Sequence, residues 1–199
     1  MRTSRNPISF RVAPTFYFVG ALLLLIIPLR WLVAAAVSAA VHELCHIAAI
    51  RAFGIPIHCV KIGVGGATIE TQEMSLAQEL VCALTGPFGG MLLLLVGKWF
   101  PVTAVCAGFH TIYNLLPVYP QDGGRALRCG ARLLLPDRWA AILCNGVECV
   151  CLVGVAVLGI YGTFILKVGI FPVIFTLLFL RRSIGMKNSL QRGERRGTI

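Results

Sequence analysis

Apolar residues run through this chain in long blocks, which glycine, proline and charged residues interrupt. About twenty apolar residues cross a bilayer as one helix, and the blocks predict six such spans. They cover residues 12–29, 31–51, 79–98, 101–119, 139–159 and 162–180. The glycines from Gly159 to Gly162 are expected to separate the last two spans. The predicted fold class is therefore an all-α polytopic membrane protein with six transmembrane helices.

The segment between the second and third spans does not fit a spanning helix. Residues 55–71 are glycine-rich, and apolar and polar positions alternate around residues 58–62 and 67–70. Gly65 and Gly66 lie between these runs, so the pattern predicts a short membrane-associated β-hairpin. Two interpretations stay open: a plain cytoplasmic hairpin, or an edge strand that pairs with an extended peptide.

Composition excludes a soluble protein. Hydrophobic residues make up 57% of the 199 residues and charged residues only 13%, whereas soluble domains carry about 25% charged residues. The net charge of +10 would suit a nucleic-acid partner, but the basic residues punctuate the apolar blocks instead of forming one patch. Fifteen of the 18 Lys and Arg residues fall on one side of a six-span arrangement. This bias predicts that both termini are cytoplasmic, that the basic tail 181–199 lies on anionic lipid, and that no nucleic acid binds.

The most informative motif is the run from His42 to His46, with Glu43 beside the first histidine. Residues four apart share one face of a helix, so the two imidazoles can reach one metal ion. Glu43 can take a proton from water activated there. The flanks are apolar, and ionisable residues at membrane depth are costly enough to indicate function.

A catalytic zinc ion usually takes three protein ligands and leaves one position open. Asp122 is the best candidate for the third ligand. It follows a broken apolar span, on the same predicted side of the membrane as the histidines, and Gly123 and Gly124 allow close backbone approach there.

These residues resemble the site-2 protease family of intramembrane zinc metalloproteases, peptidase family M50. His42 to His46 fits its HExxH motif, and the segment from Asn114 through Pro117 to Asp122-Gly123 fits its Asn-x-x-Pro-x-x-x-x-Asp-Gly motif. Gly86-Pro87 is similar to a glycine-proline segment of the family, although Gly90 stands where Asn is frequent. The resemblance covers residues 31–135 and is strongest to the branch of the stage IV sporulation protease FB.

The resemblance implies a single metalloprotease domain over residues 1–199, with a catalytic core at 31–135, in a bacterial cell membrane. One Zn²⁺ would be held by His42, His46 and Asp122, with Glu43 as the general base. The substrate would be a membrane-embedded or membrane-tethered protein, such as a sigma or anti-sigma factor, cut near the cytoplasmic face, and an inhibitory membrane partner is a further expectation. The residues expected to contact the substrate or its oxyanion are Asn114, Gly65, Gly66, Gly86 and Pro87.

Two other functions compete with a protease. The chain could be a catalytically silent membrane regulator, although retention of both histidines, Glu43 and Asp122 argues against this. It could also be a metal-ion transporter, since intramembrane ionisable residues mark transport routes. A transporter would more often spread such residues over several spans, whereas here they concentrate at one depth in two segments.

Overall fold

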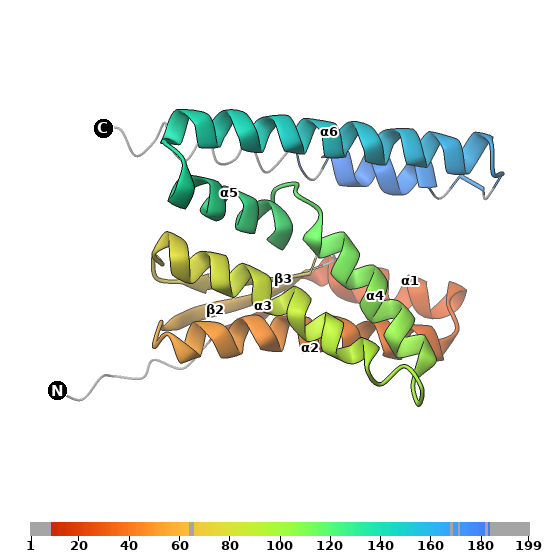
Figure 1. Cartoon of the computed structure of the whole chain (residues 1–199). Coiled ribbons are helices and arrows are strands. Elements are labelled where there is room, and N and C mark those ends of the chain that lie inside the picture. The colour runs from red at the N-terminus through yellow and green to blue at the C-terminus, as the bar shows by residue number, and fades with distance from the viewer. Residues whose placement is uncertain (1–8, 64–65, 168, 171, 182, 184–199) are drawn as a thin grey trace. The chain divides into compact units, whose positions relative to one another are not determined.

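The computed structural model of the chain describes residues 9–63, 66–167, 169–170, 172–181 and 183. It is mostly helical and divides between Asn114 and Leu115 into two compact units (Figure 1). Gly65 and all of the predicted basic tail except Arg181 and Ser183 lie outside the described residues. The single domain predicted over residues 1–199 stays a prediction.

The first unit combines four helices with a small sheet. Its elements, in chain order, are β1 (Ser9–Val12), α1 (Pro14–Ile26), α2 (Leu29–Ala52), β2 (Ile57–Gly63), β3 (Gly66–Thr71), α3 (Leu76–Leu94) and α4 (Pro101–Leu115). A capping box starts α3, because Ser75 Oγ accepts the Gln78 N–H and the Gln78 side chain returns to the Ser75 N–H. This cap fixes where the chain leaves the sheet and enters α3.

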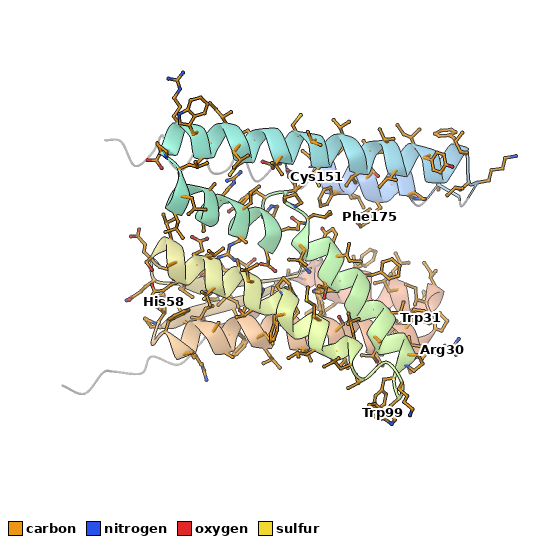
Figure 2. The ribbon with its side chains drawn as sticks, in the orientation of Figure 1. Arg30, Trp31, His58, Trp99, Cys151 and Phe175 are labelled. Atoms are coloured by element: carbon orange, nitrogen blue, oxygen red, sulfur yellow. The ribbon has the colours of Figure 1, made fainter. Side chains whose placement is uncertain are left out.

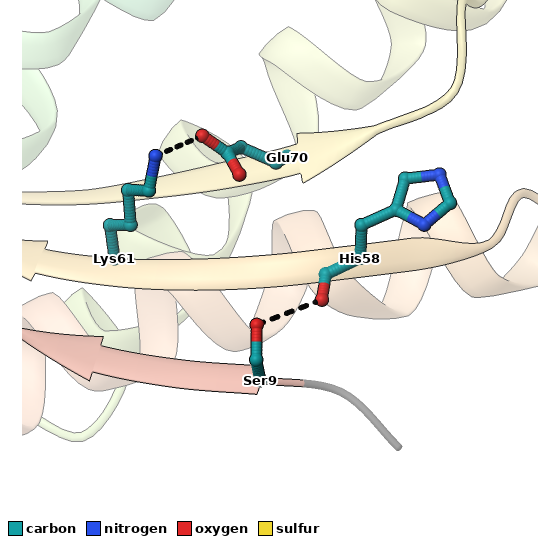
Figure 3. Close-up of polar contacts among 4 residues, drawn as sticks. All are labelled: Ser9, His58, Lys61 and Glu70. Carbon is teal, nitrogen blue, oxygen red and sulfur yellow. Dashed lines mark hydrogen bonds and ion pairs between the residues drawn. The ribbon is translucent and has the colours of Figure 1, made fainter. Parts of the chain in front are cut away.

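The predicted hairpin is confirmed. Strands β2 and β3 pair antiparallel, with Gly63 opposite Gly66 at the turn, and an exposed Lys61–Glu70 ion pair links them (Figure 3). Strand β1 was not predicted. It pairs parallel with β2, and Ser9 Oγ donates to the His58 carbonyl at 3.2 Å (Figure 3). The sheet order β1-β2-β3 leaves β3 at an edge.

A small apolar core fastens this sheet to the helices. Ile50 at the end of α2, Ile57 and Val60 on β2, and Cys82 on α3 are all buried in one cluster. Burying such side chains stabilises the arrangement through the apolar area removed from water. The hairpin is therefore held against the same end of α2 that carries His46.

The second unit contains α5 (Asp122–Leu134), α6 (Asp137–Phe164) and a helix over Pro172–Arg181. The predicted break at residues 159–162 is wrong, because α6 continues to Phe164. A Cβ on Gly159 would lie 2.2 Å from Thr176 Oγ1, and one on Gly162 would touch Pro172. These glycines therefore allow the following helix to approach closely, as small residues do between membrane helices.

Six spans are not confirmed. Among the described residues, three helices are long and apolar enough to cross a membrane: α2, α3 and α6. At 1.5 Å per residue, the 13 residues of α1 and the 15 of α4 reach only about 20 and 22 Å, short of a hydrocarbon core of ~30 Å. Within the first unit, Arg30, Trp31 and Trp99 gather at one end and His58 lies at the other (Figure 2). Exposed tryptophan beside arginine is typical of a membrane–water boundary.

Candidate metal centre

The histidine pair lies on the buried face of α2. The buried residues of this helix recur every four positions, at Ala34, Ser38, His42, His46 and Ile50. His42 is only 2% exposed and His46 only 8% exposed. The prediction that both imidazoles share one helix face is confirmed, and that face points into protein.

The two rings are arranged as a metal site requires. His42 Nε2 and His46 Nε2 lie 3.1 Å apart, and the rings meet edge to face at 83°. Two nitrogens bound tetrahedrally to zinc at 2.0–2.1 Å would be separated by about 3.3 Å. The separation of the two nitrogens is therefore close to that of two zinc ligands.

A backbone carbonyl orients His46. The carbonyl oxygen of Cys82 on α3 lies 2.7 Å from His46 Nδ1. A carbonyl only accepts, so Nδ1 carries the proton and Nε2 keeps its lone pair for a metal. The Thr85 hydroxyl also donates to this oxygen, at 2.8 Å. Pro87, buried inside α3, has no N–H for the Ala83 carbonyl four residues earlier.

Gly86 makes room for the pair. A Cβ at this position would lie 2.2 Å from His46 Nε2 and 2.8 Å from His42 Cε1. Such distances are impossible without moving both rings. Gly86 is thus placed beside the histidines themselves, and Pro87 is buried in the same helix; the predicted substrate contact of these two residues stays a prediction.

Glu43 faces the hairpin. Its Oε1 accepts the Ala67 N–H at 3.3 Å, at the start of β3. Gly66, at φ +110°, lies beside the same oxygen, since a Cβ there would be 3.9 Å from it. The strand edge and the carboxylate beside the metal ligands are therefore neighbours.

Sequence reasoning missed His110. Its ring on α4 packs edge to face against His42, with 4.7 Å between centroids. The sequence did carry a sign of this residue, because an ionisable side chain inside an apolar block, such as that of His110, usually marks function. Asn114, one turn further along, donates to the His110 carbonyl at 2.9 Å, and its predicted oxyanion role stays untested.

In the second unit, Asp122 is the first residue of α5 and only 8% exposed. A helix N-terminus favours a carboxylate. Gly123 and Gly124 pack on the preceding loop so tightly that added Cβ atoms would lie 2.1 Å from the Leu115 oxygen and 2.5 Å from the Val118 carbonyl carbon. Asp122 is the predicted third ligand; it is buried, and a carboxylate is a ligand type that zinc accepts.

The chain is similar to known metalloproteases. No protein-family model matches the chain. A zinc metalloprotease of Methanocaldococcus jannaschii is 28% identical over 108 residues, which cover 46% of this chain and 31% of that protein. The chain therefore spans about a third of that relative's length. The solved structure of the site-2 protease from Methanocaldococcus jannaschii matches with a TM-score of 0.56 and 19% identity, covering 89% of this chain and 88% of that one. The fold is thus that of a site-2 protease.

Proposed function

We propose that this protein is a zinc metalloprotease of the site-2 protease type that hydrolyses peptide bonds in membrane-associated proteins. The observation that carries the proposal is the buried histidine pair, whose Nε2 atoms lie 3.1 Å apart on a helix long enough to span a membrane. The sequence relative, a zinc metalloprotease, and the site-2 protease fold both support it.

His42, His46 and Asp122 would hold the zinc ion. When bound, zinc acts as a Lewis acid that makes water a nucleophile near neutral pH. The chain fixes the ligands in advance: Cys82 sets the tautomer of His46, and Gly86 leaves both imidazoles in place. With two neutral imidazoles and one carboxylate as ligands, a bound Zn²⁺ would keep a net positive charge, which would attract a carbonyl oxygen.

Glu43 is the general base in this proposal. Its carboxylate takes the proton from the attacking water and passes it to the leaving amine. The Ala67 N–H holds Oε1 at 3.3 Å, which orients the carboxylate. Because this contact comes from β3, the same edge strand can align an extended substrate segment beside Glu43.

The substrate class follows from the position of the histidine pair on α2, a helix long enough to span a membrane. A peptide must leave its helical hydrogen bonds before its carbonyls can be attacked, and an edge strand offers the replacement bonds. We infer that the protein is an integral membrane protein with both termini cytoplasmic and that it cuts membrane-embedded or membrane-tethered proteins near that face. Sigma or anti-sigma factors, an inhibitory membrane partner, a bacterial membrane and the sporulation-protease branch remain part of this proposal.

Removing the third ligand tests it. Asp122→Ala is expected to weaken zinc binding by the purified protein at least tenfold and to abolish cleavage of a co-expressed single-span reporter tagged on both sides. Chelation should remove cleavage from the wild type, and added zinc should restore it. If the protein binds zinc but cleaves none of a panel of reporters, the result would favour a catalytically silent regulator. Zinc flux into vesicles would favour a metal-ion transporter.

Gly66→Ala tests the hairpin. An alanine at φ +110° is strained, by roughly 1–3 kcal/mol, so the strand start that holds Glu43 should shift. We expect slower cleavage with zinc affinity unchanged, measured by reporter cleavage and by competition with a chromogenic chelator. Gly130→Ala on α5, where a Cβ meets nothing within 4 Å, is the control. Equal cleavage by both variants would contradict a role for the hairpin.

A further inference from the structure

Glu148 is a buried acid that the proposed chemistry does not use. It lies eleven residues into α6, a helix of membrane-spanning length, and is only 2% exposed. Removing a carboxylate from water is costly unless it is paired, and an ionisable residue in a membrane helix usually marks function. The partners of Glu148 therefore indicate what it does.

Two partners bind its two oxygens. The Ser183 hydroxyl lies 3.2 Å from Oε1, and Arg128 Nη2 of α5 lies 3.6 Å from Oε2. Small buried residues, Ala131, Ala140 and Cys144, pack α5 against α6 beside this pair. Glu148 thus fixes the guanidinium of Arg128 from the neighbouring helix.

Arg128 in turn contacts the loop that leads to Asp122. Its Cζ lies 4.5 Å from the centre of the Tyr119 ring, a cation–π arrangement. Tyr119 stands three residues before Asp122. The loop backbone is closed by the Gln121 N–H, which donates to the Val118 carbonyl at 2.9 Å, and by the close approach of Gly124 to Val118. A shift of Tyr119 would therefore be passed on to Asp122.

We propose that Arg128, held by Glu148 and stacked on Tyr119, is a positioning residue that presets the Asp122 carboxylate for the metal. The inference rests on the proposed function, in which Asp122 is a zinc ligand. A planar guanidinium can face a ring and a carboxylate together, which an ammonium cannot do equally well. Residues that orient metal ligands typically change metal affinity 10–100-fold when replaced.

Zinc alone is the probe for the test. In the detergent-solubilised full chain, Arg128→Lys, Tyr119→Leu and Glu148→Gln are each expected to weaken zinc binding about tenfold, measured by chelator competition. Tyr119→Phe keeps the ring and should retain wild-type affinity. Arg132→Gln breaks an exposed pair with Asp137, whose side chains are 58% and 91% exposed, and should change nothing.

The outcomes separate the two proposals. If Asp122→Ala binds zinc as tightly as the wild type, the ligand set itself is wrong. If Asp122→Ala weakens binding but Arg128→Lys and Tyr119→Leu do not, the positioning role is overturned. Thermal unfolding of the zinc-free proteins controls for misfolding: Arg128→Lys should melt like Arg132→Gln while differing from it in zinc affinity. Equal affinity of these two variants would also overturn the inference.

Discussion

Glu43→Gln is expected to slow peptide cleavage about a thousandfold while leaving zinc binding intact. The amide has the size of the carboxylate but cannot take a proton, and general acid–base catalysis contributes typically 10²–10⁴-fold. The proposed metal ligands His42 and His46 are untouched, and the glutamine oxygen can still accept the Ala67 N–H that reaches Glu43 Oε1 at 3.3 Å. Reporter cleavage and bound zinc per chain, measured on the same preparation, would show the separation.

The matched control is Glu70→Gln, which removes an acidic residue from the same region. Glu70 is 46% exposed and pairs across the hairpin surface with Lys61, so its loss should leave the cleavage rate within about twofold. A Glu43→Gln protein that cleaves at the wild-type rate would eliminate Glu43 as the base. A protein that loses zinc as well would indicate a structural role for the carboxylate.

Spacing made the shared helix face of the two histidines predictable. A separation of four residues places His42 and His46 on one helix face in any α-helix, and the structure keeps both on the buried stripe of α2. The hairpin was predictable for a similar reason, because alternation with a period of two and a Gly-Gly turn are local signals. These features depend on residues close together in the chain.

The errors came from signals that depend on distant partners. Strand β1 pairs with β2 about fifty residues away, and four residues carry no sign of such a partner. Gly159 looked like a helix break, but it serves a close contact with Thr176.

The glycine-proline segment of α3 acquires a physical role that its sequence did not specify. It was predicted to contact substrate, but Gly86 leaves space for the two imidazoles, and the Cys82 carbonyl one turn earlier on the same helix binds His46. Gly86 therefore acts on the predicted metal ligands before any substrate arrives. The same reasoning predicts that the smallest possible side chain at position 86 is already too large.

Gly86→Ala is expected to weaken zinc binding about a hundredfold or more and to abolish cleavage. Its Cβ would lie 2.2 Å from His46 Nε2, 2.5 Å from His46 Cε1 and 2.8 Å from His42 Cε1, so both rings must leave the geometry that fits zinc. This exceeds the usual effect of replacing a residue that merely orients one ligand.

Gly89→Ala, one turn along α3, is the matched control, because its Cβ would meet Cys45 Sγ at 2.3 Å and not a ligand. Gly89→Ala should keep zinc, and adding Cys45→Ala should restore any lost stability. In a His46→Ala background most of the clash at position 86 is gone, so Gly86→Ala should then cost little further thermal stability. Tight zinc binding by Gly86→Ala would contradict this prediction. It would show that the two rings can shift together without losing the metal, so that zinc affinity does not depend on their present geometry.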